Sequence, residues 1–223
     1  MIITIDGPAG TGKSTAAKKL AEAIGFTYFD TGALYRAISW SLLEHGVSCT
    51  DEEALSAHLK SFTFRIKTVG DEKRYFVGDR DVTKEIRTKE VTAIVSKVAA
   101  LKLVRDALKP LQVNFGREMD VIFEGRDLGS VVFPHAQLKF YLTASAEVRA
   151  RRRYRELVCK FPEQSFSYDS ILSDIEKRDA FDSEREHAPL VQPEDAVLVD
   201  TSDLSIEEVT KKLKEIYLAK CKK

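Results

Sequence analysis

Short apolar runs alternate with amphipathic segments along most of the chain. Runs of three to five mostly β-branched or aromatic residues are typical of strands buried on both faces. They predict strands at residues 2–5, 26–29, 121–123, 138–142 and 197–199. Apolar spacings of three and four predict helices at residues 13–24, 33–43, 90–101 and 102–115, from about 146, at 169–181, and after 205 to 217. Because strands and helices alternate, we expect a parallel sheet with helices on both faces.

One stretch departs from this pattern. Apolar and polar residues alternate between residues 62 and 68, and a second apolar run at 75–77 follows across Gly70-Asp71. Alternation with a short glycine-containing turn predicts a β-hairpin, and hairpins form antiparallel pairs. We therefore expect a small antiparallel insert at about residues 62–83.

Short motifs predict where some helices begin or break. Thr50 with Glu53 fits a capping box, in which a hydroxyl and a carboxylate satisfy the first backbone N–H groups of a helix. Ser205 with Glu208 repeats this motif before the last predicted helix. Pro110 is expected to kink or break the helix in which it falls, because proline lacks the backbone N–H.

Composition places the chain of 223 residues among ordinary globular proteins. Hydrophobic residues make up 43% and charged residues 31%, which excludes disordered and collagen-like chains. Thirty-five basic residues balance thirty-five acidic ones, so binding to nucleic acid or acidic membranes over a whole surface is not expected. No apolar run approaches the roughly 18 residues of a membrane helix. The three cysteines form no Cys-x-x-Cys pair and no secretory signal pattern is visible, so we expect a cytoplasmic protein.

The clearest motif joins the first predicted strand to the first predicted helix. Residues 7–14 read Gly-Pro-Ala-Gly-Thr-Gly-Lys-Ser and match the pattern G-x-x-x-x-G-K-[ST] completely. Glycines let successive N–H groups surround a phosphate, and the helix N-terminus adds partial positive charge. Lys13 can reach the β- and γ-phosphates, and the Ser14 hydroxyl can bind Mg²⁺. The residues predicted to bind ATP here are Gly7, Pro8, Ala9, Gly10, Thr11, Gly12, Lys13, Ser14 and Thr15.

This loop indicates nucleoside triphosphate binding, and other features narrow the class. A small GTP-binding switch needs an Asn-Lys-x-Asp box, whereas the single asparagine, Asn114, is followed by Phe115. The four histidines show no spacing that fits a metal site or a catalytic triad. Helicases and motor proteins need a longer chain. A small kinase remains.

Arginines occur where such a kinase needs positive charge. Phosphoryl transfer between two polyanions requires positioning and charge neutralisation. Arg36 lies one turn into the helix after the second strand, and Arg126 follows a strand end, where parallel sheets bind ligands. Five arginines fall within residues 149–155, and Arg149 and Arg153 share a helix face. Beside the phosphate loop, we interpret this helix as a mobile lid over ATP, in preference to a solvated face or an RNA-binding patch.

Together these motifs resemble those of the bacterial cytidylate kinases, a family of nucleoside monophosphate kinases. The Gly-Arg-Asp-x-Gly and Asp-Thr-Gly-Ala-x-Tyr-Arg segments are specific to that family. The resemblance implies a three-layer α/β P-loop fold with a small antiparallel insert in the monophosphate-binding region and an arginine-rich lid. It also implies ATP-dependent phosphorylation of CMP and dCMP with Mg²⁺. The segments that carry the likeness are residues 6–15, 30–36, 85–88, 124–134, 178–179 with 182 and 185, and 188–190.

The resemblance also divides the single kinase unit, residues 1–223, into regions. The core would bind ATP, a second region would bind the monophosphate and a third would form the lid. The expected bounds are 1–30, 84–145 and 186–223 for the core, about 31–83 for the monophosphate-binding region with its insert at 62–83, and about 146–185 for the lid.

Roles for single residues follow from the same resemblance. Arg149 would stack on adenine, and Arg153 would neutralise charge in the transition state. Arg36 and Arg126 would hold the CMP phosphate, with Thr31 close by. The residues expected to bind CMP are Thr31, Tyr35, Arg36, Ser96, Arg105, Arg126, Asp127, Arg178, Asp182 and Arg185. The expected catalytic residues are Lys13, Arg126, Arg153 and Arg185, and the expected metal ligand is Ser14.

Within this set, Ser96, Arg105 and Asp127 would read the cytosine base. A carboxylate accepts a hydrogen bond from the exocyclic amine of cytosine, as Asp does in DNA recognition. Uracil presents a carbonyl at that position, and two facing acceptors cost roughly 1–3 kcal/mol. We therefore expect CMP to be preferred over UMP.

Two other classes stay open at the level of sequence. One is a kinase for a neutral hydroxyl acceptor such as shikimate or gluconate, which would need a base near Mg²⁺. The other is a nucleic-acid-binding NTPase that uses residues 149–155 as its contact surface. The family reading predicts ATP and CMP or dCMP as partners, with no nucleic acid and no membrane. Because no coiled-coil pattern or apolar seam stands out, we expect a monomer.

Overall fold

The computed structural model describes residues 1–70, 72–117 and 119–221. The chain forms two compact units. Unit 1 consists of Met1–Phe29 and Val113–Lys223, and unit 2 of Asp30–Gln112. Among the described residues, no helix is both long enough and apolar enough to span a lipid bilayer.

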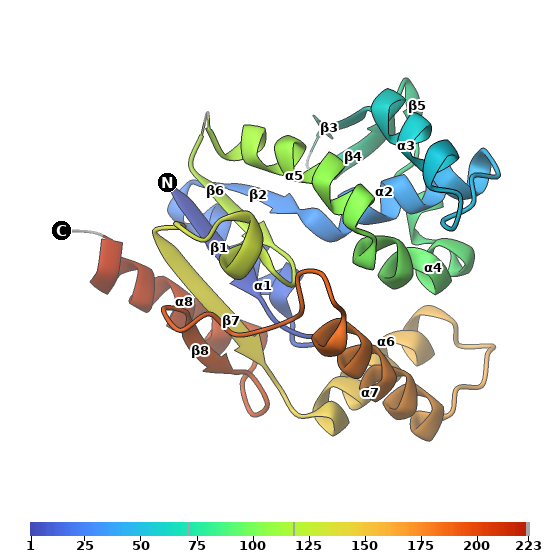
Figure 1. Ribbon diagram of the computed structural model, residues 1–223. Helices are drawn as coiled ribbons and strands as arrows, with labels where there is room; N and C mark the ends of the chain where they lie inside the picture. Colours follow the sequence, from blue (N-terminus) through green and yellow to red (C-terminus); the bar gives the residue numbers. More distant parts are fainter. Residues whose placement is uncertain (71, 118, 222–223) are drawn as a thin grey trace. The chain divides into compact units, whose positions relative to one another are not determined.

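A five-stranded sheet forms the centre of unit 1 (Figure 1). Its strand order is β2-β6-β1-β7-β8, and β1 pairs in parallel with both β6 and β7. β7 also pairs in parallel with β8. Parallel pairing brings the carboxyl ends of these strands to one edge, where such sheets bind ligands. The strand bounds are β1 Ile2–Asp6, β2 Thr27–Asp30, β6 Val121–Glu124, β7 Leu138–Thr143 and β8 Val197–Asp200.

Helices α1 (Lys13–Ile24) and α8 (Ile206–Cys221) cover one face of this sheet. Every second residue of β1 points to that face, and Ile3 and Ile5 are fully buried there. They pack in one core with α1, through residues such as Leu20, and with α8, through Leu213. Burial of these aliphatic side chains seats α1, and with it the loop that precedes α1, on the end of β1.

The opposite face of the sheet carries an aromatic cluster. Phe29 at the end of β2 lies 4.6 Å from Phe115 and 5.2 Å from Phe123 between ring centroids. Phe123 in turn lies 4.4 Å from Phe133. Phe133 directly follows η2 (Leu128–Val132), a one-turn π-helix that leaves the end of β6. Short π-helical turns are frequently found at functional sites.

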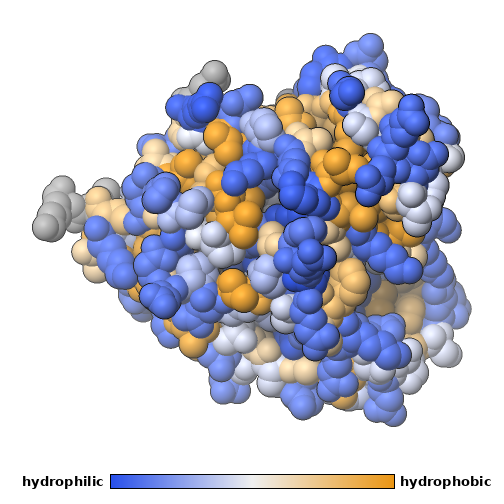
Figure 2. Space-filling view, in the orientation of Figure 1, coloured by the Kyte–Doolittle hydropathy of each residue, from blue (hydrophilic) through white to orange (hydrophobic). Residues whose placement is uncertain are grey.

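Two further helices of unit 1 pack against each other. They are α6 (Ala146–Lys160) and α7 (Tyr168–Glu184). Tyr154 and Tyr168 meet edge to face at 6.5 Å between centroids, which links the two helices at one end. The surface over this pair is mainly hydrophilic on the face in Figure 2, in keeping with the exposed arginines of α6.

Unit 2 combines helices with a small sheet. The first helix, α2, packs against β4, α4 and the short η1 turn. The antiparallel sheet has the order β3-β4-β5, and β3 and β4 pair in register from Phe64 with Val77 to Val69 with Glu72. The bounds are α2 Thr31–Glu44, α3 Glu52–Ser61, β3 Phe64–Val69, β4 Glu72–Val77, β5 Arg80–Asp81, η1 Glu85–Arg87, α4 Lys89–Ala100 and α5 Lys102–Arg117, whose last residues belong to unit 1.

Most predicted elements are confirmed, within a few residues at their ends. The five predicted strands form the sheet of unit 1, and the predicted hairpin forms β3 and β4. Asp71 of the predicted turn lies outside the described residues. Unit 2 ends at Gln112, and α4 packs on α2 within it. The division into core, monophosphate-binding region and lid stays a prediction.

Two details of the predicted helices differ in the structure. Of the two outcomes predicted at Pro110, a kink or a break, the break does not occur, because α5 continues to Arg117. Both Pro110 and Asp106 are exposed, so the carbonyl of Asp106 that loses its N–H partner can bind water. Thr50 does not cap α3, because the side chain of Asp51 accepts from the N–H of Ala54 at 3.0 Å.

Candidate active site

The predicted phosphate loop connects β1 to α1 and is shaped by its glycines. Gly7, Gly10 and Gly12 all have positive φ angles, a conformation that other residues rarely adopt. A Cβ on Gly7 would lie 2.0 Å from the carbonyl oxygen of Leu142, so no side chain fits there. No side chain caps α1, so its first N–H groups are available to bind an anion in the loop.

Lys13 lies over this loop and is almost fully buried. Its Nζ donates to the carbonyl oxygen of Pro8 at 2.7 Å and lies 3.9 Å from Oε1 of Glu124. Burial lowers the pKa of Lys13 to about 7, and the nearby positive charge of Arg126 acts in the same direction. Anionic phosphates in the loop would reverse this effect and favour the charged lysine.

Glu124, at the end of β6, is a site residue whose role the sequence motifs do not predict. Its Oε2 accepts from the hydroxyl of Ser14 at 3.0 Å and from the hydroxyl of Tyr28 at 3.4 Å. A hydroxyl beside a carboxylate is an oxygen pair suited to Mg²⁺. The described residues contain no group of three or more His, Cys, Asp or Glu that could hold a metal. An ion at Ser14 would therefore need phosphate and water as its remaining ligands.

The segment after β6 brings predicted acceptor residues together with α7. Arg126 Nε lies 3.2 Å from Oδ2 of Asp182, and Arg178 Nε lies 4.0 Å from the same oxygen. Arg185 donates from its NH2 group to Oδ1 of Asp127 at 3.4 Å. All five of these side chains belong to unit 1, and the structure places them in one alternating cluster of positive and negative charge.

Arg185 is held in this cluster by the chain that follows α7. Its Nε donates to the carbonyl oxygen of Ala188 at 2.6 Å. Ala188 has a φ of 52°, a left-handed conformation that is uncommon for alanine. The N–H of Leu190 then donates to the carbonyl oxygen of Asp182 at 2.7 Å. This strained turn accounts for the Ala-Pro-Leu segment at residues 188–190, because it folds back on α7 and orients Arg185.

The remaining predicted acceptor residues lie in unit 2. The guanidinium of Arg105 lies 5.6 Å from the ring centroid of Tyr35, so the structure brings this pair together. Arg36 donates to the carbonyl oxygen of Ile86 at 3.2 Å and to the hydroxyl of Thr92 at 2.9 Å. Thr31 opens α2 and is buried, while Ser96 lies partly buried on α4.

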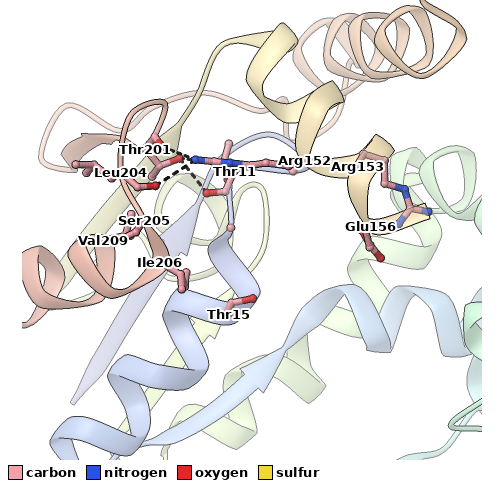
Figure 3. A pocket seen from close by; sticks show the side chains of 12 residues that line it. Thr11, Thr15, Arg152, Arg153, Glu156, Thr201, Leu204, Ser205, Ile206 and Val209 are labelled. Atoms are coloured by element: carbon pink, nitrogen blue, oxygen red, sulfur yellow. Dashed lines mark hydrogen bonds and ion pairs between the residues drawn. The ribbon is translucent and has the colours of Figure 1, made fainter. Parts of the chain in front are cut away.

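A cavity of about 530 Å³ lies beside the phosphate loop in unit 1 (Figure 3). One wall is the loop itself with the start of α1, and the other walls come from α6 and from the segment between β8 and α8. Thr201 joins these walls, because its hydroxyl donates to the carbonyl oxygen of Thr11 and is itself bonded by Arg152. The lining residues are Gly10, Thr11, Gly12, Thr15, Arg152, Arg153, Glu156, Thr201, Leu204, Ser205, Ile206 and Val209.

Arg149 lies behind the loop, and the cavity lining does not include it. Its guanidinium donates to the carbonyl oxygens of Ala144 at 2.9 Å and Ala9 at 3.2 Å, and it pairs with Asp179 at 2.6 Å. These contacts lie in the plane of the guanidinium, but Arg149 is only 4% exposed. Stacking on adenine, which the resemblance implied, would require a face of the guanidinium to become accessible. From α6, it is Arg152 and Arg153 that reach the cavity.

Comparison with known proteins shows which family this chain resembles. The family model described as Cytidylate kinase matches residues 3–218. A cytidylate kinase of Protochlamydia amoebophila is 52% identical over 217 residues, covering 96% of this chain and 95% of that protein. One from Carboxydothermus hydrogenoformans is 47% identical, with 97% and 96% covered. One from Halalkalibacterium halodurans is 46% identical, with 94% of each covered.

Proposed function

The chain belongs to the cytidylate kinase family, and from this premise we propose that it transfers the γ-phosphoryl group of ATP to CMP or dCMP. The products are ADP and CDP or dCDP. The observation that carries the proposal is the match to cytidylate kinases over nearly the whole length of both chains. A kinase for shikimate or gluconate is disfavoured by that membership.

ATP binds with its phosphates in the loop of residues 7–15. The cavity beside the loop takes the adenine, because the apolar side chains of Leu204, Ile206 and Val209 line it within reach of the loop. Lys13 then pairs with the β- and γ-phosphates. Mg²⁺ accompanies ATP, and Ser14 together with Glu124 would hold it. The ion supplies neutralisation of phosphate charge.

The residues that we propose for the acceptor are each placed within their own unit. In unit 1 they are Arg126, Asp127, Arg178, Asp182 and Arg185, and in unit 2 they are Thr31, Tyr35, Arg36, Ser96 and Arg105. Arginines suit this role because their planar guanidinium groups bind phosphate through two parallel hydrogen bonds. The Asp127 carboxylate accepts from the amine of cytosine, which gives the preference for CMP over UMP.

Transfer proceeds in line. An oxygen of the CMP phosphate forms a bond to the γ-phosphorus while the bond from that phosphorus to the bridging oxygen of ADP breaks. The acceptor oxygen is already anionic, so no general base is required. Lys13, Arg126, Arg153 and Arg185 stabilise the negative charge that spreads over the transferring group. Residues 146–185 act as a lid that closes over ATP.

We further propose that the protein acts in the cytoplasm as a monomer, with these small molecules as its partners. Binding of nucleic acid through residues 149–155 is opposed by the contacts of that segment. Arg149 is buried, Arg152 is bonded to Thr201, and Arg153 pairs with Glu156 at 2.8 Å. These arginines are therefore not a uniformly solvated basic face.

The test is ADP formation from ATP and Mg²⁺ with CMP, dCMP, UMP, AMP, GMP or shikimate offered separately. Rapid turnover with CMP and dCMP, and much slower turnover with UMP, is expected. Faster turnover with shikimate or with a purine monophosphate than with CMP would overturn the proposal.

A further inference from the structure

The buried carboxylate of Asp6 has no part in the function proposed above. Asp6 is the last residue of β1, directly before the phosphate loop, and only 1% of it is exposed. One oxygen accepts the backbone N–H of Leu128 at 3.0 Å, and the other accepts that of Gly129 at 2.8 Å. These are the first two residues after Asp127, the proposed reader of cytosine.

Both bonds cap the π-helical turn η2 from outside its own segment. Asp127 occupies the N-cap position of η2, where aspartate commonly bonds the first N–H groups of its own helix. Here the Asp127 side chain makes no capping bond, and its Oδ1 accepts from Arg185 instead. Asp6 thus performs the capping that Asp127 would otherwise perform.

Two successive residues of β1 hold the Arg126–Asp127 segment from both sides. Before it, the N–H of Gly125 donates to the carbonyl oxygen of Ile5 at 3.1 Å. After it, Leu128 and Gly129 donate to Asp6. The backbone of Arg126 and Asp127 is therefore fixed at its start and at its end to one rigid strand.

The contact between the turn and β1 is also tight. A Cβ on Gly129 would lie 3.0 Å from Oγ1 of Thr4, 3.1 Å from Cδ of Lys139 and 3.3 Å from Oδ2 of Asp6. At these distances a Cβ would fit only if its neighbours moved apart slightly. Glycine at residue 129 lets the turn approach closely enough for both oxygens of Asp6 to be bonded.

We propose that Asp6 is a positioning residue that holds Arg126 and Asp127 in the orientation in which they bind the acceptor nucleotide. It acts through two backbone N–H groups of η2, and the proposal rests on the function given above. Full burial raises the pKa of Asp6 to about 7, and the charge of Asp127 adds to this, while the two N–H bonds and Lys13 oppose it. The two N–H bonds and the charge of Lys13 thus favour the ionised form of the Asp6 carboxylate.

The first variant is Asp6→Asn, which keeps the size of the side chain but directs an NH₂ group at one of the two N–H donors. We expect KM for CMP to rise about tenfold, as for the loss of one charge-assisted hydrogen bond, with KM for ATP within about twofold of wild type. The ratio of kcat/KM for CMP to that for UMP should fall. This ratio is independent of the fraction of folded enzyme, so a merely structural defect would not change it.

Ile3→Val is the matched control. Ile3 is fully buried on the same strand, three residues before Asp6, but it packs on the face covered by α1 and α8. It makes no bond to the N–H groups of Leu128 or Gly129, which donate to Asp6. The CMP to UMP ratio should stay at the wild-type value in this variant.

Gly129→Ala perturbs the contact between η2 and Asp6 without removing any charge. If Asp6→Asn does not fold, the CMP to UMP ratio of Gly129→Ala alone tests the proposal. A similar fall in the CMP to UMP ratio is expected. If Asp6 acted instead through its charge on Lys13, Asp6→Asn would change KM for ATP and leave the ratio intact, and Gly129→Ala would retain selectivity. Either result overturns the inference.

The wild-type enzyme separates this inference from the proposed function. Failure of wild type to use CMP counts against the function itself. Preference of wild type for CMP, retained in both Asp6→Asn and Gly129→Ala, leaves the function standing and overturns only the role of Asp6.

Discussion

At the scale of single residues, Lys13 combines deep burial with neighbouring positive charge. Arg126 and Arg178 both act to lower its pKa, and burial lowers it most, to about 7. Glu124 and Asp6 act in the opposite direction but do not compensate. An empty loop therefore holds a lysine that is largely neutral above pH 7, and a bound triphosphate supplies the negative charge that protonates it.

The affinity for ATP should consequently fall with rising pH. Because binding raises the pKa of Lys13, a proton is taken up above pH 7, and the dissociation constant should rise by up to about tenfold per pH unit. Titration calorimetry with MgATP between pH 7 and 9 measures this. Lys13→Met should bind more weakly and lose the dependence, whereas Lys18→Ala, an exposed lysine one turn further along α1, should retain it. The same slope in Lys13→Met would contradict the assignment.

Asp127 carries the expected selectivity for cytosine. In Asp127→Asn the amide is a weaker acceptor for the cytosine amine than the carboxylate. The activation free energy that corresponds to kcat/KM should therefore rise by about 1–3 kcal/mol for CMP and by less for UMP. Steady-state kinetics with both nucleotides measure the ratio. Asp106→Asn, at an exposed ion pair on α5, serves as the control and should leave both values unchanged. Equal losses for CMP and UMP would show that Asp127 does not read the base.

Residues in contiguous motifs were predictable from sequence, and residues that act across strands were not. The phosphate loop and the Arg126–Asp127 segment each stand in one stretch of chain. Glu124 and Asp6 gain their roles only because β6 lies beside β1, a pairing that no local pattern encodes. Local pattern likewise predicted a basic helix but not its rotation, which buries Arg149 and turns Arg152 to the cavity.

At the scale of elements, capping chemistry shows where local sequence is sufficient. Ser205 and Glu208 form the predicted box, since Glu208 N–H donates to Ser205 Oγ at 3.2 Å and Ser205 N–H donates to Glu208 Oε2 at 2.8 Å. Thr50 fits the same pattern, yet Asp51 caps α3 one residue later. Because Thr50 and Asp51 are both good N-cap residues, the sequence pattern alone does not show at which of them the helix begins. The π-helical η2 has no sequence signature of its own, because its cap comes from β1.

Ser205→Ala should destabilise the protein by about 1 kcal/mol through loss of this cap. Urea unfolding without nucleotide measures the change, because Ser205 also lines the cavity. Glu208→Gln is the matched control, since glutamine can still accept the bond from Ser205 N–H and should cost less. Equal stability of Ser205→Ala and wild type would exclude the cap as a contributor.

Arg149 should contribute more to the stability of the folded protein than to the binding of adenine. Arg149→Met removes the partner of Asp179 and the bonds to Ala9 and Ala144, which should cost about 3 kcal/mol. Unfolding experiments measure this cost, and KM for ATP measures any effect on binding. Arg151→Met, at an exposed position of the same helix, is the control. Unchanged stability with a large rise in KM for ATP would instead favour the stacking role.

At the scale of the whole molecule, the boundary between the units was the least predictable feature. Hydrophobic pattern located the hairpin and the helices, but not that α4 packs on α2 and so belongs with them. The spacing of apolar residues shows that a helix has an apolar face, but it does not show which other element that face packs against. Unit 2 accordingly holds the proposed acceptor residues of α4 and α5 as well as those of α2.

The most direct test of the central claim follows the phosphoryl group itself. ATP labelled with ³²P at the γ-position is mixed with CMP, Mg²⁺ and an excess of enzyme, and the products are separated after a single turnover. The label should appear in the β-phosphate of CDP, in an amount equal to the ADP formed. Label released as inorganic phosphate, or ADP formed without labelled CDP, would contradict the account.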